Sequence, residues 1–114
     1  MIINLTQHIA TPEQRKAGVF DPACKKVIQK LLTFDELPTK DEIEQRARKL
    51  ATLAYLYNAK KAMIGGAPFL MASLEKALKE RNITPVYAFS RREVIEESNG
   101  KKISVFKHLG FVEA

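Results

Sequence analysis

The sequence predicts a single α/β domain built on a mostly parallel sheet. Short apolar segments typical of buried strands alternate along the chain with amphipathic segments typical of helices. The chain has 114 residues, of which 46% are apolar, and this suits one core rather than two. We therefore expect one three-layer, Rossmann-like domain over residues 1–114, with an antiparallel hairpin at its C-terminal end.

The first third of the chain predicts one strand and two helices. The apolar run at residues 2–5 is typical of a buried strand, and a polar loop follows it. Thr11, with Gln14 three positions later, forms a capping box that starts a short helix, and Gly18 ends it. Asp21-Pro22 repeats the cap signal, so we expect a second amphipathic helix to begin there.

The middle of the chain predicts a long helix, a strand, another helix and a further strand. Thr39 opens a second capping box, and apolar residues at helical spacing continue to about residue 58. Residues 61–64 form the next strand, and residues 68–81 form a helix that begins with proline. Residues 84–89 are almost continuously apolar, which is typical of a parallel strand covered on both faces.

Asn99-Gly100 predicts a tight hairpin near the end of the chain. This dipeptide favours the two-residue turns that join antiparallel strands. If both residues occupy the turn, Ser98 lies opposite Lys101, and counting outwards places Arg91 opposite His108. The last strand then runs antiparallel to the one before it.

The chain is basic, with a net charge of +6. Most of the excess comes from residues 59–92, which carry +5, whereas residues 93–114 carry −1. Such a bias attracts a polyanion, and the alternative is an ordinary solvated basic face.

The composition also indicates where the protein acts. Cys24 is the only cysteine, so the chain has neither an internal disulfide nor a cysteine-rich zinc site, which fits a reducing compartment. No apolar run is long enough for a membrane span, and the first residues lack the features of a signal peptide. We expect a cytoplasmic protein with no membrane partner, no metal and no cofactor.

Three predicted strand ends carry polar or flexible residues, and these form the candidate site. They are Thr6, Gln7 and His8 after the first strand, Gly65 and Gly66 after the second, and Ser90, Arg91 and Arg92 after the third. Because the carboxyl ends of parallel strands meet at one edge of a sheet, we expect these groups to converge on a ligand. The glycine pair lets backbone amides approach a phosphate, and the helix after it adds its positive end.

Each of these residues also has a structural interpretation. The glycine pair is equally compatible with a plain tight turn, and the two arginines with charges that protect a sheet edge. His8 is compatible with a loop-packing role, but its imidazole is also the best candidate for a general base, with His108 as a further ligand-binding candidate. No spacing of histidines and acidic residues indicates a metal site.

The start of the chain resembles that of small CRISPR-associated Rossmann-fold (CARF-like) proteins. The resemblance covers Ile3-Asn4-Leu5-Thr6-Gln7-His8 and Thr11-Pro12-Glu13-Gln14, where a first strand runs into a Thr and His loop and then into a Thr-x-x-Gln helix start. It implies a homodimer that binds a cyclic oligoadenylate across its two-fold axis. In the ring nucleases of that group, a ribose 2′-hydroxyl attacks the adjacent phosphate without a metal.

Two functions of different classes follow from these observations. The first is a nucleotide-binding enzyme, a metal-independent phosphodiesterase acting on a cyclic oligonucleotide, with His8 as the catalytic base. The second is a non-catalytic module that senses a nucleotide or binds a protein partner. A general acid or base at the strand ends would favour the enzyme over the non-catalytic module.

Overall fold

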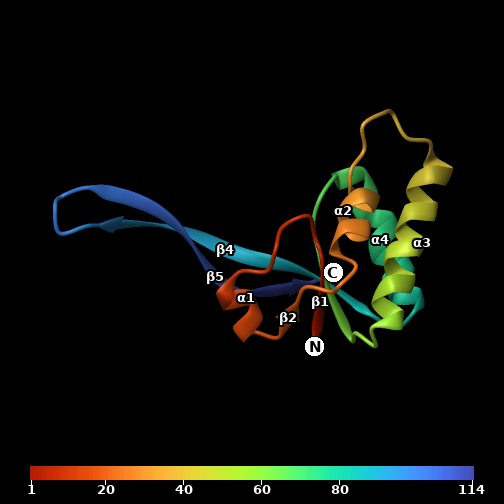
Figure 1. The fold of residues 1–114 in the computed structure, drawn as a ribbon, viewed down its shortest axis with the longest axis horizontal. Helices are drawn as coiled ribbons and strands as arrows, with labels where there is room; N and C mark the ends of the chain where they lie inside the picture. Colours follow the sequence, from red (N-terminus) through yellow and green to blue (C-terminus); the bar gives the residue numbers. More distant parts are fainter.

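A computed structural model describes residues 1–114 and shows a mixed α/β fold with one five-stranded sheet and four helices (Figure 1). In chain order the elements are β1 (Ile2–Leu5), α1 (Pro12–Lys16), β2 (Val19–Phe20), α2 (Lys25–Leu32), α3 (Lys40–Leu56), β3 (Lys61–Ile64), α4 (Pro68–Glu80), β4 (Thr84–Glu96) and β5 (Lys102–Glu113). None of these helices has the length and apolar character needed to span a bilayer.

The strand order places a topological switch in the middle of the sheet. The order is β2-β1-β3-β4-β5, in which the first four strands are parallel and β5 runs antiparallel to β4. The mostly parallel sheet is thus confirmed. The chain leaves β1 towards β2 on one side and returns through β3 on the other side. In open parallel sheets the connections diverge at such a point and leave a crevice outside the carboxyl ends of the two strands.

The two faces of the sheet are covered unequally. The helices α2, α3 and α4 lie together on one side, where the larger core cluster joins them to Ile3, Leu5 and Ile64 (Figure 1). The opposite side carries α1, which contributes no buried residue, and a smaller cluster that includes Ile2 and Met63. The predicted three-layer arrangement is therefore not confirmed, because the second helical layer is incomplete.

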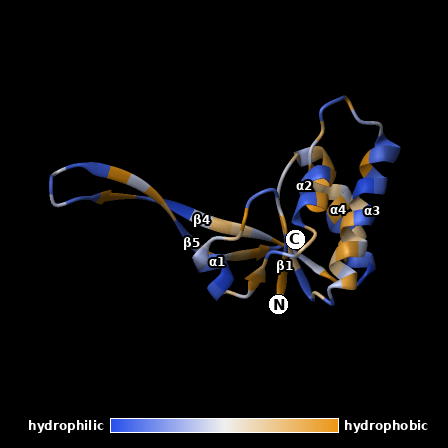
Figure 2. Ribbon diagram, in the orientation of Figure 1, coloured by the Kyte–Doolittle hydropathy of each residue, from blue (hydrophilic) through white to orange (hydrophobic).

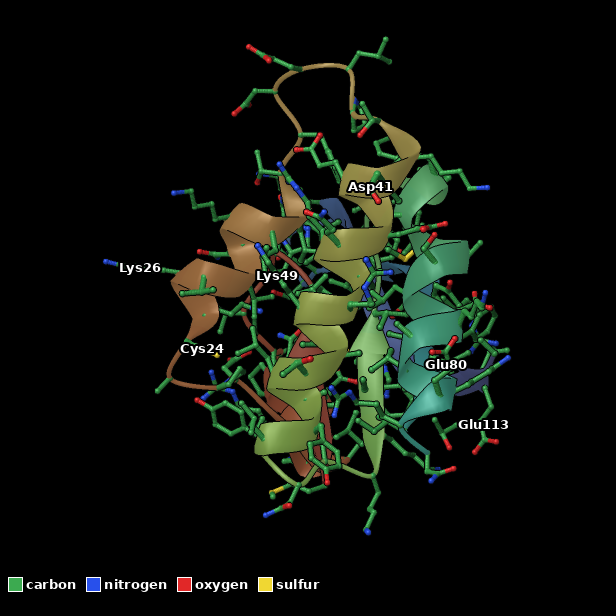
Figure 3. The ribbon with its side chains drawn as sticks, turned by 90° about the vertical axis from the view of Figure 1, so that its right-hand side faces the viewer. Cys24, Lys26, Asp41, Lys49, Glu80 and Glu113 are labelled. Carbon is green, nitrogen blue, oxygen red and sulfur yellow. The ribbon has the colours of Figure 1, made fainter.

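The long helix α3 shows how the helical layer is built. Its small and apolar residues Ala47, Leu50 and Ala54 are buried in the core cluster. Its charged residues Asp41 and Lys49 point away from the sheet in Figure 3. Figure 2 shows the same division, with hydrophilic residues on the outer side of α3. This period of about 3.6 residues is what holds the helix against its neighbours.

The helix ends follow the predicted signals. Gln14 N donates to Thr11 Oγ1 and Thr11 N donates to Gln14 Oε1, both over 3.1 Å, which completes the predicted capping box. Thr39 caps α3 by accepting from the amide three positions later, without the reciprocal bond of a full box. Just beyond α3 and α4, Asn58 and Asn82 adopt left-handed backbones with φ of 57° and 59°.

The segment between α1 and α2 differs from the prediction. Asp21-Pro22 does not cap a helix, and α2 begins at Lys25 with no side-chain cap. The reason is that the Asp21 carboxylate accepts hydrogen bonds from Asn4 and Ala10 instead. Before it, the short strand β2 pairs with β1. Two residues are too few to show a strand period, so the sequence did not predict it.

The C-terminal hairpin is present, but its predicted register is wrong by one residue. Gly100 N donates to Glu97 O over 2.9 Å, and Glu97 N donates to Lys101 O over 2.8 Å, so three residues form the loop. Gly100 has φ of 82°, and such a left-handed glycine completes a three-residue hairpin loop. Arg91 therefore pairs with Lys107 and not with the histidine predicted opposite it.

The strand β4 is longer than predicted. It continues past Phe89 as one strand of 13 residues, and only its first residues, Thr84–Val86, pair with β3. A register shift between Phe89 and Ser90 marks a bulge, beyond which β4 and β5 leave the sheet as a two-stranded ribbon (Figure 1). We call residues 89–109 the arm.

Candidate ligand-binding cleft

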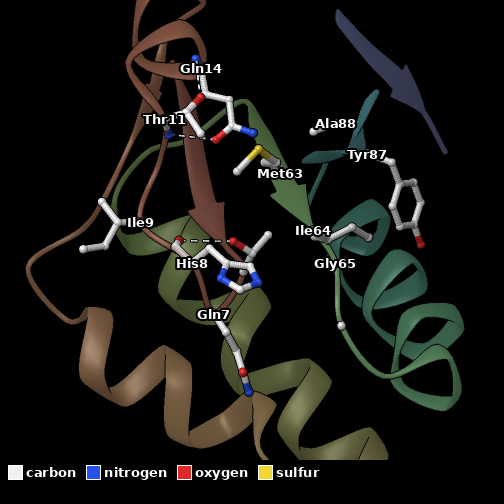
Figure 4. Close-up of a pocket in the computed structure, with 12 residues that line it drawn as sticks. Gln7, His8, Ile9, Thr11, Gln14, Met63, Ile64, Gly65, Tyr87 and Ala88 are labelled. Atoms are coloured by element: carbon white, nitrogen blue, oxygen red, sulfur yellow. Dashed lines mark hydrogen bonds between the residues drawn. The ribbon is translucent and has the colours of Figure 1, made fainter. Parts of the chain in front are cut away.

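A cleft of about 520 Å³ opens at the topological switch, outside the carboxyl ends of β1 and β3 and beside Tyr87 and Ala88 of β4 (Figure 4). Its lining consists of Thr6, Gln7, His8, Ile9, Thr11, Gln14, Met63, Ile64, Gly65, Gly66, Tyr87 and Ala88. The loop after β1 and the glycine turn after β3 thus meet at one site, as the sequence indicates. No Asp, Glu, Lys or Arg side chain lines the cleft.

The buried residue Asn4 fixes the loop that forms one wall of the cleft. Its Oδ1 accepts from Thr6 N over 2.9 Å and from Thr6 Oγ1 over 2.7 Å. Its Nδ2 donates to His8 O and to Asp21 Oδ1, each over 2.7 Å. An asparagine side chain has two donor and two acceptor positions, and all four are used here. The path of residues 6–8 is therefore set by hydrogen bonds to the strand before it.

Asp21 and Lys25 support the same loop from outside the cleft. Lys25 Nζ donates to Thr6 O over 2.6 Å and lies 3.8 Å from Asp21 Oδ1. Burial alone would raise the pKa of Asp21, but hydrogen bonds from Asn4 and Ala10 and the charges of Lys25 and Arg15 outweigh it, so this pKa lies below its usual value. Burial lowers the pKa of Lys25, and Asp21 offsets only part of that effect.

The glycine turn presents free backbone amides. None of the turn, loop, cap or side-chain hydrogen bonds uses the N–H of Gly66 or Ala67, and α4 begins directly afterwards at Pro68. Gly66 has φ of 145°, a backbone that L residues rarely adopt. A Cβ on Gly65 would lie 3.6 Å from the Thr6 methyl group, which is an ordinary contact. The turn therefore needs glycine at position 66 for its backbone.

His8 is the titratable side chain of the cleft that ordinarily changes charge near neutral pH. Its carbonyl accepts from Asn4 and Thr6, which positions the backbone, whereas its exposed imidazole bonds to no protein group. Figure 4 shows this imidazole beside the bond between Thr6 and the His8 carbonyl. An imidazole so placed is free to exchange a proton with a molecule in the cleft.

Tyr87 belongs to the cleft lining, but its side chain points away from His8 and towards α4 (Figure 4). Its hydroxyl donates to Glu75 Oε2 on α4 over 2.6 Å. Burial, together with this hydrogen bond and the negative charge of Glu75, raises the pKa of Tyr87 to about 12. The hydroxyl therefore stays protonated at neutral pH and holds the ring against α4.

A family model matches residues 1–112, and its description is the Uncharacterized protein MJ1673 family. The chain belongs to this family. No curated protein and no solved structure matches it. The cleft of this MJ1673-family chain is therefore interpreted from its own geometry.

Four of the sequence-predicted site residues lie outside the cleft lining of this MJ1673-family chain. Ser90, Arg91, Arg92 and His108 lie on the arm, because β4 does not end at Phe89. Arg91 donates to Glu93 over 2.9 Å, and the His108 ring packs on Phe111 with centroids 4.8 Å apart. Ser90 and His108 pair across the two strands of the arm.

Gln7 lines the cleft but is engaged with α2. Its Nε2 donates to Thr33 Oγ1 over 2.9 Å, and its carbonyl accepts from Gln29 Nε2 over 2.9 Å. No group of three His, Cys, Asp or Glu side chains gathers where it could hold a metal ion. Asn4 and Asp21 were not among the predicted site residues, although a lone asparagine in the apolar run 2–5 was a visible signal. Four of the predicted residues lie together at the cleft and have either free polar groups or a place in the fixed loop. They are Thr6, His8, Gly65 and Gly66.

Proposed function

We propose that the cleft binds a nucleotide or a cyclic oligonucleotide, with a phosphate against the amides of Gly66 and Ala67. The observation that carries the proposal is that these two consecutive N–H groups make no hydrogen bond within the chain. They precede α4, whose N-terminal end has partial positive charge. Because the cleft has no Lys or Arg, the backbone supplies the positive field.

The size and the remaining walls of the cleft fit the same class of ligand. Its volume of about 520 Å³ lies within the roughly 300–1,000 Å³ typical of small-molecule sites. Ile9, Met63 and Ala88 supply apolar surface. Apolar surface of this kind receives a nucleobase, while the amides receive its phosphate.

The enzyme form of the proposal assigns His8 as the general base. His8 accepts the proton of a ribose 2′-hydroxyl, whose oxygen attacks the adjacent phosphorus. The bond from phosphorus to the 5′-oxygen breaks, a proton from water completes the leaving hydroxyl, and a 2′,3′-cyclic phosphate remains. The alternative is a non-catalytic nucleotide sensor or interaction module. The observation in its favour is that Tyr87, the other ionisable side chain of the cleft, is engaged with Glu75.

The resemblance to CARF-like proteins adds three finer proposals. The ligand is a cyclic oligoadenylate, the protein acts as a homodimer with the ligand on its two-fold axis, and the fold is of the Rossmann-like class. A cyclic oligonucleotide presents the same groups to two copies of one site, which is why two-fold symmetry suits it. We place this function in the cytoplasm, where nucleotides are available.

Calorimetric titration of the whole chain with cyclic and linear oligoadenylates, together with chromatography of the reaction products, tests these assignments. His8→Ala should reduce cleavage by on the order of a hundredfold and retain binding. The matched control is His108→Ala, which replaces the only other histidine and lies outside the cleft, so cleavage should be unchanged. Gly65→Ala should weaken binding, because its methyl group enters the cleft.

Each result has a definite meaning for the proposal. Binding without cleavage by the unmodified chain selects the sensor. Equal cleavage by the unmodified chain and His8→Ala removes His8 as the base. If no mononucleotide or oligonucleotide binds at all, the cleft is not a nucleotide site.

A further inference from the structure

The two strands of the arm extend away from the rest of the molecule. Beyond residue 90 its two strands pair only with each other, and Figure 1 shows them projecting on the side of the sheet opposite α2, α3 and α4. The longest extent of the molecule is 53 Å, against 32 and 25 Å in the other directions. An isolated two-stranded ribbon is only marginally stable in water.

Both faces of the arm carry exposed apolar side chains. The register puts Val94 and Phe106 on one face, where they are 64% and 73% exposed. It puts the cross-strand pair Ile95 and Ile103 on the other face, and these are also exposed. Figure 2 shows these apolar bands along the ribbon. Since the apolar residues alternate between faces, the arm cannot hide them by folding one face onto its own chain.

The chain exposes more surface than a compact monomer of its mass, as expected if a partner covers part of that surface. The accessible surface is 7526 Å², whereas a compact monomer of 12.9 kDa has about 6,300 Å². The radius of gyration is 15.8 Å, against about 13 Å for a compact chain of this length. The excess surface of roughly 1,200 Å² exceeds the roughly 800 Å² that each partner buries in a standard stable interface.

We propose that the arm is an association element that clasps a second copy of the same chain. The charges on its strands support this occupant. The strand β4 carries Arg91, Arg92, Glu93 and Glu96 within the arm, and β5 carries Lys102 and Lys107. Two arms related by a two-fold axis can place the glutamates of each against the lysines of the other, and the contact then repeats itself as such symmetry requires.

A nucleic acid is a less suitable occupant of the arm. Acidic side chains interrupt its basic residues, and the exposed bulk consists of Val, Ile and Phe. Nucleic-acid surfaces are dominated by Lys and Arg contacts to phosphates. The bulge at Phe89 and Ser90 directs the arm away from the sheet, which is the role that bulges have in re-aiming a ribbon. This inference depends on the arm alone and holds whatever the cleft binds.

Light scattering of the whole chain across the micromolar range, with matched variants, tests the proposal. The unmodified chain should have twice the mass of one chain, and the double variant Val94→Asp with Phe106→Asp should have the mass of one chain. Leu37→Asp is the control, because Leu37 is 98% exposed in the loop before α3, on the helical side of the molecule. It should keep the double mass.

A second variant keeps the test independent of those substitutions. Replacing residues 93–105 by Asn-Gly shortens the arm outside both core clusters, and circular dichroism should report the helices unchanged while the mass falls to one chain. A single-chain mass for the unmodified protein overturns the proposal, as does a double mass that persists in both arm variants. A higher mass that disappears on nuclease treatment also overturns it and assigns the arm to a nucleic acid. Nucleotide binding by the single-chain variants would show that the cleft functions without the arm contact.

Discussion

Asn4 Nδ2 donates to Asp21 Oδ1 over 2.7 Å, and this bond joins strand β1 to the segment that leads into α2. The same asparagine side chain also holds the Thr6 amide and hydroxyl through its Oδ1. The wall of the cleft is therefore fixed by a residue that does not line it. Its removal affects both stability and the shape of the cleft.

Asn4→Leu should lower the free energy of unfolding by at least about 2 kcal/mol, because it leaves buried partners without hydrogen bonds. Leucine has a similar volume but offers no donor to His8 O and no acceptor for Thr6 N. Urea denaturation followed by circular dichroism measures the change. The control Gln45→Leu removes an exposed amide and should change stability by less than about 0.5 kcal/mol. Similar losses in the two variants would contradict the role assigned to Asn4.

Asp21 should contribute to the loss of stability in acid. Its pKa in the folded chain is below the ordinary value of 3.8, since the hydrogen bonds and positive charges around it outweigh burial. The unfolded chain therefore binds the proton first, and the contribution is present above the ordinary pKa and is lost as pH falls through the folded one. Stability measured from pH 5 downwards should fall less steeply in Asp21→Asn than in the unmodified chain. The exposed control Asp35→Asn should retain the original slope, and an identical slope in Asp21→Asn would refute the assignment.

The sequence predicted the parts of the fold that local chemistry determines. The Thr11 capping box, the end of the long helix near residue 58 and the helix periods all depend on residues within a few positions of each other. The convergence of residues 6–8 with the glycine turn also followed, because parallel strands must share an edge. In each of these features, a single interaction determines the local structure.

The sequence alone does not predict the local structure at positions where two local signals compete. It also does not predict the structure of a segment whose interaction partner is distant along the chain. Asp21 has the chemistry of a helix cap, but Asn4 and Ala10 reach its carboxylate first in the folded chain. Gly100 is compatible with a three-residue loop as well as with a two-residue loop. The structure has the three-residue loop, so the register between β4 and β5 differs from the predicted one by one residue. The length of β4 depends on pairing with β5 rather than on its own composition. Arg91 and Arg92 consequently lie on the arm and not at the strand ends.

The two glycines of the turn should differ sharply in their tolerance of alanine. Gly66→Ala should destabilise the fold by about 1 kcal/mol or more, because its φ of 145° is unfavourable for a residue with a Cβ. Gly65→Ala should fold with nearly unchanged stability, since its Cβ meets only the Thr6 methyl group at 3.6 Å. Thermal and urea unfolding of both variants measure the difference. If Gly66→Ala proved as stable as Gly65→Ala, the turn would have another backbone conformation in solution.

Tyr87 should appear as a late step in the alkaline absorbance titration of the chain. Burial and the bond to Glu75 raise its pKa to about 12 from the ordinary value of 10.0. Because the folded pKa lies above the unfolded one, the stability it contributes is fully present below pH 10.0 and is lost as pH rises towards 12. Tyrosinate absorbance recorded between pH 9 and 13 should therefore show a component near 12 that is missing in Tyr87→Phe. Tyr55→Phe is the matched control, because Tyr55 packs against Arg81 outside the cleft, and this variant should keep the late component. A late component that survives in Tyr87→Phe would have to come from Tyr55 or Tyr57, and it would contradict the assignment of the raised pKa to Tyr87.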